Sequence, residues 1–176
     1  MLHGKRLTLR ALTRDDLPHY VTWMNDREVA RHLLWFRPLN MDDENDWYES
    51  QRKDPDTFNF AIEITAEKKH IGSISLRLRR RVDQEAELGI VIGDKSEWGK
   101  GYCREAIGLI LAYGFFTLNL NRIYLRVHEG NIGGIKCYER SGFVLEGTLR
   151  EAGFSEGKFI NHHIMSVLRR EFQPNS

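Results

Sequence analysis

A short glycine-containing stretch joins an apolar strand pattern to a long apolar helix pattern, and this junction constrains the fold most. The strand pattern covers residues 85–92, and the helix pattern runs from about residue 102 to 118. Between them, Gly99 and Gly101 allow a tight turn and remove side chains that would separate backbone N–H groups from a ligand. A helix that begins directly afterwards adds unpaired amides and the positive end of a dipole. The stretch therefore predicts an anion site, most naturally for a phosphate or pyrophosphate.

The spacing of the glycines excludes two common phosphate-binding motifs. A P-loop has four residues between its glycines, followed by Lys and then Ser or Thr. Here five residues separate Gly93 from Gly99, and Lys100 is followed by Gly101. A dinucleotide-binding fingerprint requires Gly or Ala three positions after its second glycine, and Arg104 occupies that position. The predicted anion site is therefore of another kind.

Composition limits the class of protein further. At 176 residues the chain is most simply one domain, residues 1–176, with a sizeable core. A net charge of +1 gives no overall attraction to nucleic acid or acidic membranes. We see neither a membrane-length apolar run nor a signal peptide, so we expect a cytoplasmic protein. Cys103 and Cys137 are then expected to be free thiols, and they lack metal-ligand spacing, so no metal site is predicted.

Hydrophobic periodicity predicts the order of the remaining elements. Strands are predicted at 7–11, 58–64, 74–78, 85–92, 123–127, 143–150 and 159–168. Helices are predicted at 17–24, after Asp26 with Val29 and Leu33, at 41–52, at 102–118 and from 131 to 142, with a loop at 35–38. The resulting order is β, helices, β, β, β, α, β, α, β, β, which indicates an α/β fold with a mixed sheet.

Three pieces of the sequence resemble motifs of the GNAT superfamily of acyl-CoA-dependent N-acetyltransferases. Residues 86–92 are similar to the family's fourth strand, residues 98–106 to its pyrophosphate loop, and residues 131–143 to its asparagine-to-tyrosine helix. Within the superfamily, the sequence most resembles the group of ribosomal-protein alanine and spermidine acetyltransferases. The sequence departs from the family pattern at Trp98, Cys103 and Gly134, and none of these residues removes a backbone amide.

The resemblance implies a GNAT-like α/β (α+β) domain with a mostly antiparallel mixed sheet, helices on both faces, and a splay between its fourth and fifth strands. Acetyl-CoA would be the co-substrate, with pantetheine along the strand end, pyrophosphate on the loop amides, and Lys100 as an auxiliary charge. The residues expected to contact acetyl-CoA are Val91, Ile92, Gly99, Lys100, Gly101, Tyr102, Cys103, Arg104 and Asn131.

The implied reaction is acetyl transfer from a thioester to a neutral primary amine. An alkyl amine has a pKa of about 10, so a base must first take a proton from its ammonium form. The resemblance gives this role to Glu87, on the same strand face as Gly89 and Val91. Glu87 could instead be a structural ion-pair residue, with Glu85 or an ordered water as the base. Tyr138 matches the family's general acid toward the CoA thiolate, although a tyrosine that only packs is the alternative.

The acceptor amine stays open between a protein N-terminus, a polyamine, an amino sugar and another small amine. The first helices, the loop near residues 35–40 and the final hairpin should form its site, and one residue of the pair His162–His163 could line it. Acidic residues that could attract a cation are Asp42, Asp43, Glu44 and Asp46, and aromatic residues that could stack on a substrate are Trp35, Phe36, Trp47 and Tyr48. Both sets are explained equally well by a helix N-terminus and a packed aromatic face.

Two other functions compete with an acetyltransferase. A non-catalytic acyl-CoA-binding sensor would keep the glycine loop and gain nothing from Tyr138. An RNA-associated protein would use the basic residues 77–81, although the balanced net charge disfavours nucleic acid. The run Arg79-Arg80-Arg81 is otherwise a solvated turn. The resemblance also makes a homodimer plausible.

Overall fold

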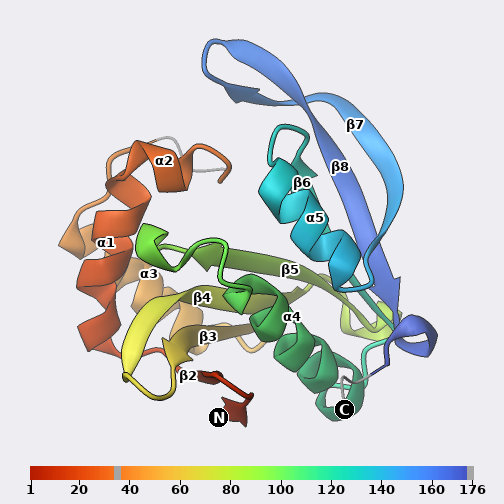
Figure 1. Ribbon diagram of the computed structural model, residues 1–176, viewed down its shortest axis with the longest axis horizontal. Coiled ribbons are helices and arrows are strands. Elements are labelled where there is room, and N and C mark those ends of the chain that lie inside the picture. The colour runs from red at the N-terminus through yellow and green to blue at the C-terminus, as the bar shows by residue number, and fades with distance from the viewer. Residues whose placement is uncertain (34–36, 174–176) are drawn as a thin grey trace.

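One eight-stranded sheet runs through the computed structural model, which describes residues 1–33 and 37–173 (Figure 1). Its strand order is β1-β2-β3-β4-β5-β6-β8-β7, and every neighbouring pair is antiparallel except β5 and β6. The strands are β1 (Leu2–His3), β2 (Leu7–Ala11), β3 (Thr57–Ile64), β4 (Lys69–Leu78), β5 (Glu85–Ile92), β6 (Arg122–His128), β7 (Val144–Ser155) and β8 (Lys158–Leu168). The predicted α/β class and mixed, mostly antiparallel sheet are confirmed.

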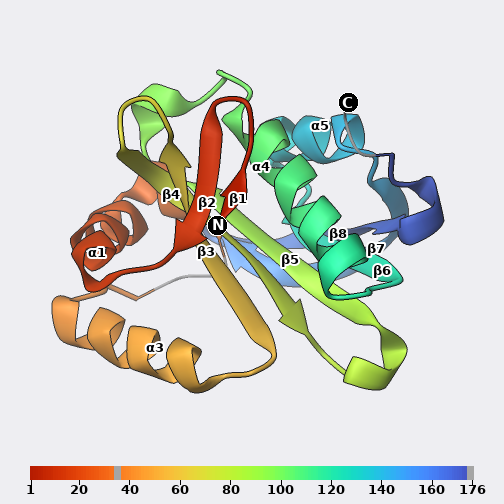
Figure 2. The same cartoon turned by 90° about the horizontal axis from the view of Figure 1, so that it is seen from below.

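Helices cover both faces of the sheet, as Figure 2 shows. The helices are α1 (Leu17–Asn25), α2 (Arg27–Ala30), α3 (Met41–Lys53), α4 (Tyr102–Ala112) and α5 (Ile132–Arg140). Helices α1 and α3 pack together on one face, while α4 packs against β2 and β4 on the other. The apolar side of α4 is fully buried at Ala106, Ile107, Ile110 and Leu111. Burial of the three larger side chains, Ile107, Ile110 and Leu111, contributes about 1.5–3 kcal/mol each and fixes α4 on the sheet.

Two predicted helices are shorter than their patterns indicate. Helix α2 ends at Ala30, so Leu33 lies in the following turn. The long apolar pattern to residue 118 is α-helical only to Ala112, and the π-helical segment η4 (Tyr113–Thr117) follows. There the N–H of Leu118 donates to the carbonyl of Tyr113 at 3.1 Å, which is an i to i+5 bond. Of the predicted loop at 35–38, residues 35 and 36 lie outside the described residues, and Arg37 and Pro38 are in neither a helix nor a strand.

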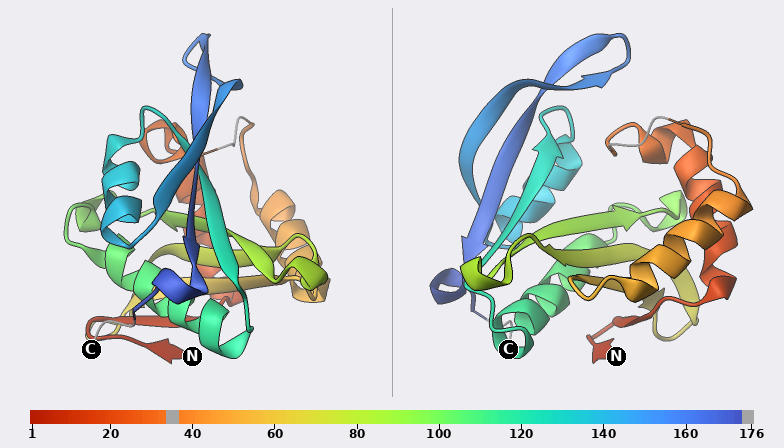
Figure 3. Two further views of the ribbon diagram at one scale, coloured as in Figure 1. Left: turned by 90° about the vertical axis from the view of Figure 1, so that its right-hand side faces the viewer. Right: turned by 180° about the vertical axis from the view of Figure 1, so that it is seen from behind.

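The predicted splay separates β5 from β6 (Figure 3). These parallel strands pair only where Glu85, Ala86 and Glu87 face residues 122–124. Beyond Glu87, β5 keeps its antiparallel partner β4 as far as Ile92, while β6 pairs with β8. The end of β5 therefore has backbone groups on one side that pair with no other described strand, which is where a ligand can add hydrogen bonds.

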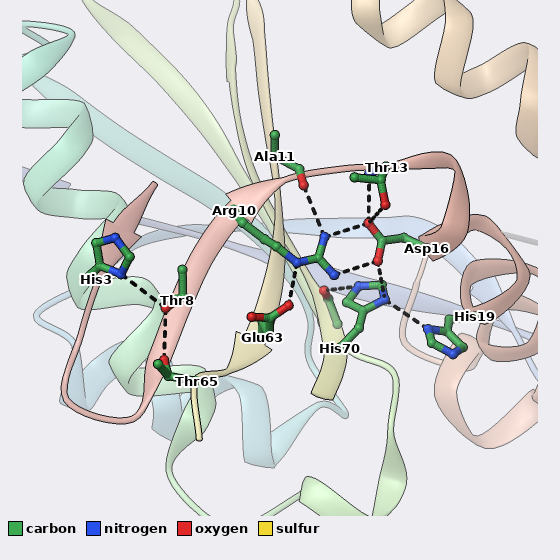
Figure 4. Close-up of polar contacts among 11 residues, drawn as sticks. His3, Thr8, Arg10, Ala11, Thr13, Asp16, His19, Glu63, Thr65 and His70 are labelled. Carbon is green, nitrogen blue, oxygen red and sulfur yellow. Dashed lines mark hydrogen bonds and ion pairs between the residues drawn. The ribbon is translucent and has the colours of Figure 1, made fainter. Parts of the chain in front are cut away.

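A buried polar network ties the start of α1 to the sheet (Figure 4). Arg10 on β2 donates to Glu63 at 2.6 Å and to both carboxylate oxygens of Asp16 at 2.8 Å. His70 on β4 lies with Nδ1 3.2 Å from Asp16. Burial opposes the ionisation of Asp16, but hydrogen bonds from Arg10 and from the Thr13 backbone outweigh it and hold its pKa at about 2. Burial lowers the pKa of His70 to about 4, so at neutral pH the Asp16 charge is balanced by Arg10.

Candidate functional site

A cavity of about 870 Å³ lies at the splay, and we call it the splay cavity. Its walls come from the end of β5, the loop before α4, the first turn of α4, the length of α5, and the segment at and after α2. Of the residues predicted to contact acetyl-CoA, all except Lys100 line it. Tyr138 lines it as well. The structure thus brings together side chains from 91 to 138 that the sequence places far apart.

The glycine loop adopts the backbone conformation that its sequence predicts. Gly99 and Gly101 have φ values of +76° and +85°, in the left-handed region that strains other residues. Gly101 is the N-cap of α4, so its turn directs the first amides of the helix toward the splay cavity. A Cβ on Gly99 would meet no atom within 4 Å. Conformation, rather than crowding, therefore requires glycine at this position.

The N-terminal strand holds this loop in place through Glu105, a contact that the sequence did not predict. Glu105 in the first turn of α4 accepts hydrogen bonds from the backbone N–H groups of Arg6 at 2.7 Å and Leu7 at 3.1 Å. The Arg6 side chain donates to Glu105 at 2.9 Å and to the Lys100 carbonyl at 3.0 Å. The partners are about a hundred residues apart in sequence, so only the fold reveals the contact.

Lys100 and Trp98 serve the loop in different ways. The Lys100 ammonium group binds Glu97 at 2.9 Å, and Glu97 also binds Lys69 at 2.7 Å. The Lys100 charge is therefore compensated by a protein carboxylate, in keeping with an auxiliary role. The Trp98 indole N–H donates to the Ile92 carbonyl at 2.7 Å. This departure from the family pattern thus anchors the loop to the end of β5.

Asn131, the N-cap of α5, and Tyr138 on α5 lie at the wall of the splay cavity. The Asn131 side-chain oxygen caps α5 by accepting from the Gly134 N–H at 3.0 Å, so its amide nitrogen is the group left to face a ligand. Tyr138 is 9% exposed, and burial raises its pKa, as do the nearby thiols of Cys103 and Cys137. Tyr138 is therefore a protonated phenol, the form that a general acid requires. Its catalytic role stays a prediction.

Glu87 lies between two arginines. One carboxylate oxygen accepts from Arg79, with its Nε at 3.1 Å, and the other accepts from Arg126 at 2.9 Å. Burial opposes ionisation, but the hydrogen bonds from Arg79 and Arg126 outweigh it and lower the Glu87 pKa. Glu87 lines neither described cavity, and the alternative base Glu85 is paired with Arg122 at 2.8 Å. This geometry matches the ion-pair alternative, and the role of Glu87 as a base stays a prediction.

The arginine run is also occupied by ion pairs. Arg79 binds Glu87, Arg80 binds Asp83 at 3.2 Å, and Arg81 binds Asp56 at 2.6 Å. The guanidinium groups are thus engaged by carboxylates of the same chain, which favours the solvated-turn interpretation of this run.

A second cavity of about 660 Å³ adjoins the first, and we call it the acidic cavity. It is enclosed by α1, α3, β4 and β5, and it shares Leu33, Ile90 and Val91 with the splay cavity. Asp43, Glu44 and Asp46 line it, as does Trp47. The first helices line this cavity, as do Arg37 and Leu39 of the predicted acceptor loop, whereas the final hairpin does not, and neither does His162 or His163. That this cavity is the acceptor site stays a prediction. Trp35 and Phe36 lie outside the described residues.

The splayed sheet and adjoining glycine loop define a class of enzyme that holds an extended acyl carrier between two strands. A family model described as "Acetyltransferase (GNAT) domain" matches residues 6–144. The chain therefore belongs to the GNAT acetyltransferase family. It is an acyltransferase of the N-acetyltransferase kind, and acetyl-CoA is the co-substrate of this family.

The chain is similar over nearly its whole length to spermidine N(1)-acetyltransferases. It is 34% identical to the enzyme of Vibrio cholerae over 96% of both chains, and 32% identical to that of Escherichia coli K12 over 93% of this chain and 87% of the relative. A crystal structure of the Vibrio cholerae spermidine N-acetyltransferase in complex with CoA and spermine has a TM-score of 0.88 at 32% identity, covering 96% of this chain and 98% of that one.

Residues 1–33 and 37–173 contain no group of three or more His, Cys, Asp or Glu that could hold a metal ion. Within the same ranges, no helix is long and apolar enough to cross a membrane.

Proposed function

We propose that this chain acetylates a primary amino group of a polyamine such as spermidine. The observation that carries the proposal is the acidic cavity, which adjoins the splay cavity at Ile90 and Val91. A polyamine carries more than one positive charge, and Asp43, Glu44 and Asp46 offer more than one carboxylate along the cavity. The similarity of the chain to spermidine N(1)-acetyltransferases supports the same acceptor.

The splay cavity is proposed to hold acetyl-CoA. Pantetheine would add hydrogen bonds to β5 near Val91 and Ile92, where β6 has diverged. The pyrophosphate would lie on the amides of residues 99–104, at the positive end of α4. The Asn131 side-chain nitrogen would contact the pantetheine arm. The thioester would then lie beside the residues that both cavities share.

Tyr138 is proposed to protonate the departing CoA thiolate. Its buried phenol stays protonated at neutral pH and lines the splay cavity. Tyr138→Phe removes this proton donor while keeping the ring, so we expect turnover to fall by about 10²-fold or more with acetyl-CoA binding unchanged. Thiol release gives turnover, and thermal stabilisation by acetyl-CoA gives binding. An unchanged turnover number in Tyr138→Phe would contradict this role. A wild type that binds acetyl-CoA but transfers no acetyl group would instead favour the sensor alternative.

Residues 1–176 are proposed to act as one N-acetyltransferase domain, since one sheet carries both cavities. We also propose self-association, because the β7–β8 hairpin exposes Phe154 and Phe159 at 66% each. Their ring centroids lie 5.3 Å apart, and both rings stay largely exposed among the described residues. A dodecameric structure is known for the Vibrio cholerae enzyme. The cytoplasmic location stays a prediction.

The function is tested by acetyl-CoA-dependent thiol release with a panel of amines. The panel contains spermidine, spermine, an alanine-terminated peptide and an amino sugar. We expect kcat/KM to be largest for the polyamines. A larger value for the peptide or the amino sugar would refute the polyamine assignment, and absence of thermal stabilisation by acetyl-CoA would refute the donor assignment.

A further inference from the structure

Glu44 is a buried carboxylate whose charge no neighbouring cation balances. It lies in the first turn of α3, is 5% exposed, and lines the acidic cavity. Three other carboxylates are buried in the described part of the chain, namely Asp16, Glu63 and Glu97. Arg10 binds the first two, and lysines bind the third. The carboxylate of Glu44 has neither a hydrogen bond nor an ion pair with any described residue.

The groups that face Glu44 do not supply a compensating charge. Asp43 and Asp46 on its own helix are acidic, and Arg37 at the cavity wall contacts Asp43 at 3.5 Å. From α1, the buried Tyr20 hydroxyl has no hydrogen-bond partner in the described residues. Strand β4 contributes two serines, and β5 contributes residues 89–91, which carry no charge. Burial and the Asp43 charge together raise the pKa of Glu44 to about 7.

An unpaired buried carboxylate is costly, so its site favours a ligand that brings a positive charge or a proton. The acidic cavity meets the splay cavity at Ile90 and Val91, beyond the last paired residues of the splay. An amine bound beside Glu44 therefore faces the side of β5 along which the acyl donor is proposed to lie. The arrangement places a proton acceptor and a cation site in one cavity, and the donor strand forms part of the wall of that cavity.

We propose that Glu44 takes the proton that the acceptor ammonium group must lose before it attacks the thioester. The inference rests on the proposed function and assigns its base. In balanced form, R–NH3⁺ and the Glu44 carboxylate give R–NH2 and the carboxylic acid. The amine nitrogen then bonds to the acetyl carbon as the C–S bond breaks, the nitrogen's second proton passes to the thiolate by way of Tyr138, and Glu44 releases its proton to water. The products are the acetamide, CoA thiol and one proton.

The proposal is consistent with the position of Glu87. Both Glu87 oxygens accept hydrogen bonds from arginines, which leaves that carboxylate a weak base outside either cavity. Glu44 has the opposite surroundings, with free lone pairs and a pKa near the pH at which a general base works best. The two carboxylates therefore make different predictions for the same pair of substitutions.

The test is the pH dependence of kcat/KM for spermidine in wild type, Glu44→Gln and Glu87→Gln. In wild type we expect kcat/KM to rise with pH up to about 7 and then level, because ionised Glu44 deprotonates the bound ammonium. In Glu44→Gln only the small unprotonated fraction of the amine can react, so kcat at neutral pH falls by about 10²–10⁴-fold. Its rate should also keep rising, about tenfold per pH unit, toward the amine pKa of about 10. Glu44→Asp should restore part of kcat.

Matched controls separate catalysis from binding and folding. Asp46→Asn removes a charge from the exposed rim of the same cavity, so it should raise KM and leave the profile unchanged. Glu44→Gln removes an unpaired buried charge, so its melting temperature and its stabilisation by acetyl-CoA should not fall.

An unchanged kcat and pH profile in Glu44→Gln would overturn the proposal, as would an effect on KM alone. Loss of the plateau in Glu87→Gln instead would also overturn it. An inactive wild type refutes the proposed function itself, so the two failures are distinguishable.

Discussion

The Asp16 carboxylate should make the stability of this protein depend on acid pH in a calculable way. Its pKa is about 2 in the folded chain, against 3.8 without the fold. Because the folded pKa is lowered, the contribution is complete above the unfolded pKa and is lost as pH falls through the folded pKa. The shift corresponds to about 2 kcal/mol at neutral pH, of which about 1 kcal/mol is lost by about pH 3.

Asp16→Asn tests this value with little change of shape. We expect the free energy of unfolding to fall by at least about 2 kcal/mol at pH 7, because Arg10 loses a buried partner. The deficit relative to wild type should shrink by about 1 kcal/mol between pH 7 and about pH 3. Urea unfolding followed by circular dichroism gives both values. The control Asp83→Asn breaks an exposed pair with Arg80 at 3.2 Å and should cost less than about 1 kcal/mol. A deficit for Asp16→Asn that does not change with pH would refute the reasoning.

Two further predictions concern the splay cavity. Gly101→Ala places a side chain at a φ of +85°, so we expect weaker acetyl-CoA binding by calorimetry with the fold retained. Gly147→Ala, where an added Cβ meets nothing, is its control, and equal affinities would contradict the role of the turn. The sulfur atoms of Cys103 and Cys137 lie 2.8 Å apart. Diamide should therefore join them in an intramolecular disulfide, seen as the loss of two hydrogens by mass spectrometry and abolished in Cys103→Ser. Persistence of both thiols would contradict that geometry.

Local patterns predicted the parts of the fold that depend on neighbouring residues. The bounds of β5 at Glu85 and Ile92 agree with the prediction, because alternation and turn residues mark both ends. The glycine turn was equally predictable, since positive φ at Gly99 and Gly101 has few other sequence solutions. The end of α4 was not predictable, because the apolar periodicity continues through the change to π-helical hydrogen bonds at Tyr113.

Contacts between segments that are distant in the chain could not be predicted from local sequence patterns. In the sequence, Glu105 is an ordinary acidic residue in the first turn of a helix, and only the fold brings Arg6 to it. The family resemblance offers Glu87 as a base, with an ion pair as the alternative, and the two arginines that pair with it come from other parts of the chain. The acidic residues of α3 form a run in the sequence, yet nothing local distinguishes Glu44 from its neighbours. Burial at the wall of the acidic cavity, without a partner for its carboxylate, makes that distinction.

The central claim is transfer of acetyl from acetyl-CoA to a polyamine across the junction of the two cavities. Its most direct test is incubation of the purified full chain with isotope-labelled acetyl-CoA and spermidine, followed by mass spectrometry of both products. We predict labelled N-acetylspermidine and CoA in equal amounts, with both formed about 10²-fold more slowly, or slower still, in Tyr138→Phe. Release of CoA without labelled acetylspermidine, or labelling of another amine in preference to spermidine, would contradict the account.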